Sequence, residues 1–524
     1  MTAEPIAIVG SACLLPGAQT PTELWDNVVA GRDCVSSAPR GRWRLDERAI
    51  ACAPSDDATT TRDKSWSDRG GYVEGFDERF DPRGFAIDAE LVASLDPLFQ
   101  WLIHAGRIAT GERAKGERDR AAVIVGNLSF PSASLNAMAE RHWLARSGLD
   151  DRALDRLGLR ARGPLNRFTS GLPAQLLARA LGFGGEAFAL DAACASSLYA
   201  IKLACDRLRD HRADLVVAGG INKTDDLFIH VGFCALQAMS KTGQSRPFHR
   251  DADGLVPAEG VALLALKRLD DAVDAGDTIH AVIRGVGLAN DGRGAGILAP
   301  SAQGQLSAMR RAYNESGVRP RDVSLFECHA TGTRVGDATE IESLSTLLRE
   351  DGIAHDAPVG SLKSNLGHLI TAAGGAGVLK VIAAMKAQTR PPTIHCEDKN
   401  AALTGSPLRL IEKAEPWASD RARLAAVSAF GFGGNDAHAI VEEWRGPNEH
   451  RRHVRVGAET LPTIAIVAVA LQTAVAIDAE SFARVVVDGS SDARRSIADV
   501  EIDPRAVRFP PRDLQQALPQ QLLV

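Results

Sequence analysis

One cysteine of this chain stands in a setting that could make it a nucleophile. Cys194 lies in the run D-A-A-C-A-S-S at 191–197, between an apolar stretch at 188–190 and a helix-like stretch at 196–208. A cysteine at such a strand-to-helix turn meets the positive end of a helix dipole, which favours the thiolate. Small neighbours leave room for a bulky thioester. The other cysteines lack this setting, and we interpret them as buried and inert.

Two histidines follow apolar stretches closely and lie among Gly, Ser and Thr. His329 stands in E-C-H-A-T-G-T at 327–333, and His368 ends K-S-N-L-G-H at 363–368. Layered α/β folds place site residues in loops beyond the strand ends. A single histidine in such a loop is more often structural, but two beside a reactive cysteine suit one reaction. A thiolate could accept an acyl group from a thioester, and two imidazoles could stabilise the negative oxygen of an enolate.

A glycine-rich run could supply a further hydrogen-bond donor. Gly431, Phe432, Gly433 and Gly434 form G-F-G-G, and glycine lets a backbone amide approach a ligand closely. The N–H of Phe432 could bind an oxyanion, while its ring borders an acyl pocket. Taken alone, the run could also be a tight turn between strands.

Alternating apolar and helix-like stretches must position these residues. A helix is expected at 20–30 with Thr20 as N-cap before Pro21, and a helical insertion at 141–167. The alternation predicts a layered α/β fold with helices covering the sheets. We expect strands at 6–9, 121–125, 187–190, 215–218, 261–266, 280–283, 324–327, 359–362 and 425–428, with the body ending near 440–444.

The last part of the chain differs from the body. Residues 445–462 are rich in Arg and His and show little apolar periodicity, which is typical of a linker. After it, P-T-I-A-I-V at 462–467 echoes P-I-A-I-V at 5–9, and D-P-R at 503–505 echoes 81–83. We interpret 463–524 as the truncated start of a second, related domain. Chance similarity with an ordinary extension is the alternative.

Composition excludes several functional classes. The 524 residues are 45% hydrophobic with a formal net charge of -6, so no overall basic field suggests nucleic acid. Eight cysteines without a C-x-x-C pair argue against zinc and a disulfide scaffold. The G-V-G run at 285–287 lacks the third glycine of a dinucleotide fingerprint. No signal peptide or membrane span is evident, so we expect a cytoplasmic protein. Because neither a metal-ligand spacing nor a dinucleotide fingerprint is present, we expect no metal or cofactor.

These motifs together resemble the β-ketoacyl synthases of fatty acid and polyketide synthases. The resemblance covers roughly 5–443 and includes R-P-F-H-R-D-A-D-G at 246–254, A-E-G at 258–260 and A-H at 437–438. It looks closest to the ketosynthase of bacterial polyunsaturated fatty acid synthases. There, a ketosynthase is followed by a chain-length-factor-like domain without the nucleophile, which would suit the tail.

The resemblance implies a thiolase-like layered αβαβα fold with two pseudo-symmetric halves, covering 1–444 and homodimeric. It implies Cys194 as the acylated nucleophile, and His329 and His368 as the groups that promote decarboxylation. Lys363 and Glu340 would be the polar pair that orients the site. The N–H groups of Cys194 and Phe432 would form the oxyanion hole. An acyl carrier protein would deliver substrates on its own phosphopantetheine arm.

Two positions depart from the family pattern, and two other functions remain open. Asn435-Asp436 stands where Thr/Ser-Asn is common, and Pro257-Ala258 replaces a glycine before Glu259. A catalytically silent chain-length or scaffold partner is the main alternative, although such partners lack the cysteine. A thiolase would need a second active-site cysteine near the end of the body, and 431–439 contains none.

Overall fold

The computed structural model describes residues 3–43, 45, 47–56, 63–111, 118–292, 296, 298–447, 465–467 and 479–488. The chain divides into two compact units, Met1–His453 and Val454–Val524. The helices of the first unit are α1 Pro21–Val29, α2 Glu47–Ile50, α3 Ala89–Ser94, α4 Pro97–Thr110, α5 Ala133–Arg146, α6 Asp151–Arg156, α7 Leu172–Leu181, α8 Ser196–Arg209, α9 Asp226–Ala235, α10 Leu269–Asp274, α11 Ala302–Ser316, α12 Arg334–Glu350, α13 Lys363–Leu366 and α14 Ala373–Ala387.

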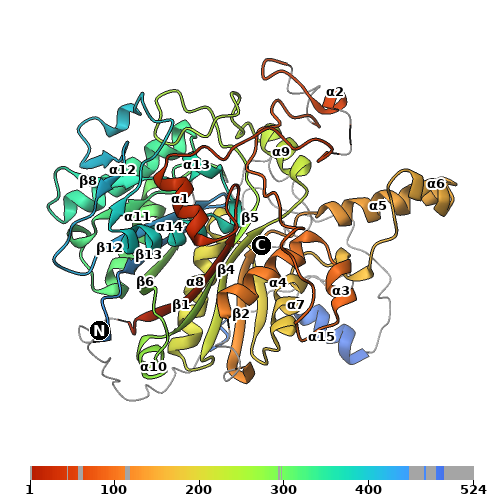
Figure 1. Ribbon diagram of the computed structural model, residues 1–524, viewed down its shortest axis with the longest axis horizontal. Helices are drawn as coiled ribbons and strands as arrows, with labels where there is room; N and C mark the ends of the chain where they lie inside the picture. The colour runs from red at the N-terminus through yellow and green to blue at the C-terminus, as the bar shows by residue number, and fades with distance from the viewer. Residues whose placement is uncertain are drawn as a thin grey trace. The chain divides into compact units, whose positions relative to one another are not determined.

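Eleven strands of the first unit form one hydrogen-bonded sheet, in the order β10-β8-β7-β12-β13-β6-β1-β5-β4-β2-β3. Figure 1 shows β1, β4 and β2 of this sheet among the helices that cover it. A small second sheet pairs β11 with β9. The strands are β1 Ile6–Leu14, β2 Ala121–Asn127, β3 Ala187–Leu190, β4 Leu215–Asn222, β5 Gly260–Arg268, β6 Ala281–Asn290, β7 Leu325–Glu327, β8 Ala357–Gly360, β9 Thr389–Arg390, β10 Leu408–Leu410, β11 Glu415–Pro416, β12 Leu424–Gly431 and β13 Asn435–Glu442.

The sheet consists of two halves with the same strand order. From the centre outward the first half runs β1-β5-β4-β2-β3, and the second runs β6-β13-β12-β7-β8 before the extra strand β10. In each half the first two pairings are antiparallel and the next two are parallel. The halves meet where β1 pairs antiparallel with β6, from Ile6 opposite Ile283 to Ile8 opposite Ala281. This repeat confirms the predicted pseudo-symmetric halves.

Helices cover both faces of each half. Helices α8 and α14 pack against strands of both halves, so they form a central layer. Helices α4 and α7 pack on the first half, α11 packs on β6 and β13, and α12 packs on α11. Side chains of β2 alternate accordingly, because Ala122 and Ile124 join the central core while Val123 and Val125 join the outer one. The predicted layered α/β architecture is thus present.

Some observed elements have bounds different from those predicted from the sequence. The first strand continues past Gly10 through a register shift after Ile8. Glycine is needed there, because an added Cβ would lie 2.0 Å from the carbonyl oxygen of Ala109. The helix predicted at 20–30 is α1, and the Thr20 side chain accepts a bond from the N–H of Glu23. The insertion predicted at 141–167 corresponds to the end of α5, which begins earlier at Ala133, to α6 and to a 3-10 turn at Pro164–Arg167.

The second unit is described only at 465–467 and at helix α15, Ala479–Asp488. The predicted repeat at 503–505 lies outside the described residues. The boundary between the units falls within the predicted linker 445–462, while Arg445 is bonded to the first unit through the carbonyls of Asp420 and Ser419. The domain assignment of 463–524 stays a prediction. One helical stretch of the described chain, Ile370–Ala387, has the length and hydropathy of a membrane span, and 78% of it is buried.

Candidate active site

The predicted nucleophile lies on a strained turn between β3 and α8. Cys194 is in the centre of a single 3-10 turn, Ala193–Ala195, and Ala193 has a φ of 49°. The Ser196 hydroxyl accepts a bond from the N–H of Ala192 at 2.9 Å and donates to the carbonyl of Ala193 at 2.6 Å. Positive φ at a non-glycine residue is costly and persists where surrounding contacts impose it. The predicted sharp turn is therefore observed.

Two glycines allow neighbouring strands to approach this turn. An added Cβ at Gly126 of β2 would lie 2.6 Å from the Cβ of Ser196. One at Gly431 of β12 would lie 2.7 Å from the carbonyl oxygen of Ala192 and 3.0 Å from the nitrogen of Cys194. Side chains at either position would displace the turn, so both glycines help to place the sulfur.

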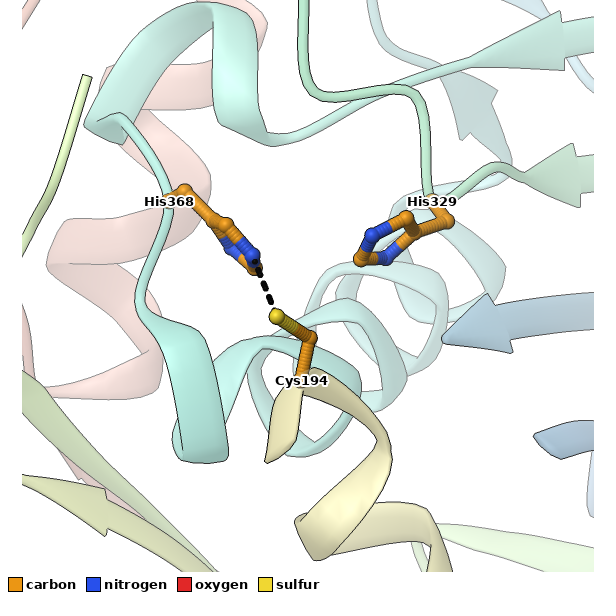
Figure 2. Close-up of side chains that lie close together, drawn as sticks. All are labelled: Cys194, His329 and His368. Atoms are coloured by element: carbon orange, nitrogen blue, oxygen red, sulfur yellow. Dashed lines mark hydrogen bonds between the residues drawn. The ribbon is translucent and has the colours of Figure 1, made fainter. Parts of the chain in front are cut away.

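His368 points directly at the sulfur. Its Nε2 lies 3.0 Å from Cys194 Sγ, as Figure 2 shows. Its backbone is fixed by pairing with the segment before β5, because its N–H donates to Val256 and its carbonyl accepts from Ala258. The N–H of Ile370 donates to His368 Nδ1 at 3.4 Å. A neutral ring that accepts at Nδ1 carries its proton on Nε2, which then faces the sulfur.

His329 approaches the same point from the second half. The Glu340 carboxylate on α12 accepts the backbone N–H groups of His329 and Ala330, each at 2.7 Å. The two histidine rings are 5.3 Å apart between centroids, and both are directed toward the cysteine (Figure 2). His329 Nδ1 is buried and has no hydrogen-bond partner among the described residues.

The three side chains converge. One nitrogen from each ring and the sulfur lie within 4.8 Å of one another, the one such group of potential metal ligands among the residues described. Thiolate and imidazole could hold a soft ion such as zinc, but the same spacing suits a nucleophile beside two hydrogen-bond donors. The structure thus brings together three predicted site residues that are far apart in sequence.

Burial controls the charge of this site. It lowers the pKa of His329 and of His368 well below that of an ordinary histidine, and the nearby charge of Lys363 acts in the same direction. Both rings are therefore neutral near pH 7 and can each donate one N–H bond. Burial also lowers the pKa of Lys363, although Glu327 and Glu340 oppose it. It raises the pKa of Glu340 to about 7.

Burial is also the largest effect on the pKa of the nucleophile. It raises the pKa of the Cys194 thiol to about 12, while the charge of Lys363 and the N–H of Phe432 act in the opposite direction. The predicted effect of the helix dipole acts against this burial and stays a prediction. The proton must leave the thiol as the substrate arrives.

The predicted polar pair is not an ion pair. Within the described residues Lys363 makes no salt bridge to Glu340, whose oxygens are occupied by the N–H groups of His329 and Ala330. A buried pair that sequence reasoning missed lies nearby. Lys380 Nζ on α14 bonds to Glu327 at 2.5 Å, and the other Glu327 oxygen accepts the N–H of Leu362. A lone lysine in an apolar helical stretch was the available signal.

The glycine-rich loop connects β12 and β13, and its role as an oxyanion donor stays a prediction. The N–H groups of Phe432 and of Cys194 itself act on the sulfur by lowering the pKa of the thiol, so both are candidate donors to an oxyanion formed beside it. Gly433 and Gly434 have φ of 84° and 79°, which favours glycine. The Phe432 ring contacts Phe233, with 6.4 Å between ring centroids.

A cavity of about 460 Å³ opens onto the three side chains. Its walls combine residues from both halves of the fold. They include Cys194, Leu236, Leu298, His329, Thr331, Thr333, His368, Phe430, Phe432 and Asp436. A largely apolar cavity with a few converging polar groups is typical of a substrate site.

Comparison with known proteins gives a consistent result. Residues 3–272 match the N-terminal domain of β-ketoacyl synthases and residues 280–397 match the C-terminal domain. The chain is 34% identical to a PKS-NRPS hybrid synthetase of Aspergillus niger, over 84% of this chain and 23% of that protein. It is 32% identical to one subunit of the polyunsaturated fatty acid synthase of a Thraustochytrium species, over 88% of this chain and 17% of that protein. The chain therefore spans less than a quarter of these relatives.

Solved structures confirm the thiolase-like fold. The PfaC keto synthase-chain length factor is similar with a TM-score of 0.80 and 32% identity, over 93% of this chain and 53% of that one. The ketosynthase from module 6 of the bacillaene synthase of Bacillus subtilis 168 gives a TM-score of 0.73 at 30% identity, over 85% of this chain and 73% of that one.

Proposed function

The chain belongs to the β-ketoacyl synthase family of acyl-transferring condensing enzymes, and we propose that it joins an acyl chain on Cys194 to a malonyl-type extender by decarboxylative Claisen condensation. The observation that carries this proposal is the convergence of one buried thiol and two neutral imidazoles on one cavity. We assign no metal or cofactor to this chain, because its own side chains and amides suffice for each step.

The first step loads the cysteine. The Cys194 sulfur attacks the carbonyl carbon of an acyl thioester, the bond to the donor's sulfur breaks, and the thiol proton passes to the departing thiolate. We expect the negative oxygen formed in the attack to accept hydrogen bonds from the N–H groups of Cys194 and Phe432. Gly431 and Gly433 allow that loop to lie against the turn. The raised pKa of Cys194 means that proton loss and attack are coupled.

The second step makes the carbon–carbon bond. A malonyl thioester loses carbon dioxide, and the electron pair left behind forms an enolate. Neutral His329 and His368 donate N–H bonds to the enolate oxygen and so lower the barrier to decarboxylation. The enolate carbon attacks the acyl carbonyl, the bond to Cys194 breaks, and the thiolate recovers a proton from solvent. The product is a β-ketoacyl thioester on the carrier.

Two buried charged residues orient these groups. Glu340 holds the backbone of His329, and Lys363 lies close enough to influence the pKa of both histidines and of Cys194. We propose that they set the position and the neutral state of the rings rather than touch the substrate.

The substrate is expected to arrive on an acyl carrier protein, whose phosphopantetheine arm is its own. We propose a polyunsaturated fatty acid synthase or polyketide synthase as the host system, with 463–524 as the start of a chain-length-factor-like domain after the linker 445–462. Similarity to the PfaC keto synthase-chain length factor over 93% of this chain supports this. A cytoplasmic location is part of the proposal, since all eight cysteines are free.

We also propose a homodimer. Strand β3 is the outer strand of its half, and its residues Ala187–Leu190 are apolar and only partly buried. An exposed apolar edge strand readily pairs with another chain. Phe130 and Phe228, with ring centroids 5.2 Å apart, are also exposed. Light scattering that gives a monomer mass would contradict this part of the proposal.

A catalytically silent chain-length or scaffold partner is the alternative function. It would retain the fold but would not accept an acyl group. The intact nucleophile beside His368 favours the enzyme.

Intact-mass analysis with a panel of acyl thioesters tests the proposal. We expect one acyl adduct on the parent, none on Cys194→Ala, and a retained adduct on Cys205→Ala, whose thiol is buried further along α8. Malonyl carrier protein should then remove the adduct as a longer β-ketoacyl product. A folded parent that no donor labels would contradict the enzyme and favour the silent partner.

A further inference from the structure

Two carboxyl groups meet in the wall of the cavity, and no salt bridge joins either of them to a cation of the described part of the chain. Asp291 follows β6 and Asp436 lies at the start of β13, and both line the cavity. Asp436 is 2% exposed. One oxygen of each side chain, Asp291 Oδ1 and Asp436 Oδ2, is buried and has no donor among the described residues. Both oxygens point at Gly304, where an added Cβ would lie 2.1 Å and 2.5 Å from them.

Two buried carboxylates that face each other would repel strongly, whereas one proton between them forms a hydrogen bond and satisfies both oxygens. Burial, followed by the charge of Asp291, raises the pKa of Asp436 to about 9, and burial raises that of Asp291. The direction agrees with the geometry. Asp436 also departs from the pattern of β-ketoacyl synthases, in which asparagine is common at this position. An asparagine side chain would donate an N–H to Asp291 in place of the shared proton.

The pair is attached to the loop that carries Phe432. The N–H of Asp291 donates to the carbonyl of Gly434 at 2.9 Å, and the Asn290 side chain donates to the carbonyl of Gly433 at 3.2 Å. Asp436 lies opposite Phe430 in the register of β12 and β13. The backbone of Asp291 is therefore bonded to the last residue of the G-F-G-G loop, and Asp436 lies opposite the residue that precedes the loop.

Few other titratable groups face the pair. Tyr199 on α8 feels the charge of Asp436 and of Arg311 on α11, and its hydroxyl donates to the carbonyl of Ala289. His438, two residues further along β13, is kept neutral because burial lowers its pKa to about 3. Among the described residues no cation forms a salt bridge with either aspartate, so burial and the partner carboxyl are the two main influences on Asp436.

We propose that Asp291 and Asp436 share one proton and thereby act as positioning residues for the backbone N–H of Phe432, and that loss of this proton at alkaline pH impairs acyl transfer to Cys194. The inference rests on the proposed function for its catalytic readout. Asp436→Asn supplies a permanent donor to Asp291, and Asp291→Asn supplies one in the opposite direction. Asp436→Leu has similar size but offers no hydrogen bond.

The rate of Cys194 acylation by one acyl thioester is measured by intact mass from pH 6 to 10, with each variant normalised to its own rate at pH 7. Above about pH 9 we expect the parent to fall relative to both asparagine variants, by about tenfold per pH unit. Before normalisation, folded Asp436→Leu should show a much lower rate than the parent at every pH, in kcat rather than in KM. Superimposed profiles of parent and Asp436→Asn would overturn the inference.

A second readout does not depend on catalysis. The folded chain keeps a proton on Asp436 that an unfolded chain loses near pH 4, so stability contributed at this site decreases as the pH rises from about 4 to about 9. Asp436→Asn lacks this dependence, and its melting temperature should increase relative to the parent between pH 5 and 9. If no protein forms an adduct at any pH, the proposed function fails, while this melting difference still decides the inference. A constant difference would overturn it.

Discussion

The two halves of the fold follow the same path but use the end of an inner strand differently. Gly126 of β2 is paired with Leu190, the last residue of β3, and Glu327 of β7 is paired with Gly360, the last residue of β8. These positions are equivalent. In the first half a glycine lets α8 and Cys194 come against the strand. In the second half Glu327 fills the space and binds the segment after β8.

This difference separates the two kinds of chemistry. The first half places the nucleophile Cys194 at a strained turn, which requires close contact between β2 and the start of α8. The second half places two neutral donors, His329 and His368, and holds their loops by buried charges such as Glu327 and Glu340. A repeated fold can therefore supply different functional groups when one residue sets the spacing between strand and helix.

Removing the buried positive charge of Lys380 in the second half should have the largest effect on the free energy of unfolding. Lys380→Met leaves the Glu327 carboxylate buried beside one N–H, and loss of one partner of a buried pair costs about 3–5 kcal/mol. Urea unfolding measures this loss.

The double variant Lys380→Met with Glu327→Gln removes both charges and retains an acceptor for the N–H of Leu362. It should recover a substantial part of the stability. Additive losses in the double variant would show that the pair does not act as a unit.

Removing one donor of the second half should affect one step more than the other. His329→Ala is expected to slow decarboxylation of a malonyl thioester by about 10²–10³-fold, the usual cost of one oxyanion donor. Acylation of Cys194 should fall much less, because the N–H groups of Cys194 and Phe432 serve that step. Carbon dioxide release and intact mass measure the two steps. Equal losses in both would contradict this division of roles.

The sequence was sufficient for features that depend on neighbouring residues. The turn at Cys194 follows from an apolar strand, small residues and a helix that are contiguous, and the strand pattern predicts the layered fold. Outside the three motifs, contacts between distant segments were not predicted. The pair Glu327–Lys380 and the pair Asp291–Asp436 join residues far apart in the chain.

The burial of Cys194 and its effect on the pKa of the thiol were also not predicted from the sequence. The dipole at the start of α8 is a local property and predicts a thiolate, whereas the raised pKa of Cys194 depends on every segment that covers it. Gly10 shows the same limit, because it permits contact with Ala109 in a helix distant in sequence rather than ending its strand.

The smallest of these effects is expected in the first half, at the glycine equivalent to Glu327. In Gly126→Ala the new Cβ lies 2.6 Å from the Cβ of Ser196 and 2.9 Å from the nitrogen of Ser197. The start of α8 must shift, which should cost about 1–3 kcal/mol and slow acylation of Cys194. Gly232→Ala in α9 is the matched control, because nothing lies within 4 Å of its added Cβ. It should gain about 0.5–1 kcal/mol from the better helix former. Urea unfolding and intact mass compare the two. If Gly126→Ala acylates Cys194 at the parental rate, close approach of β2 does not set the position of the nucleophile.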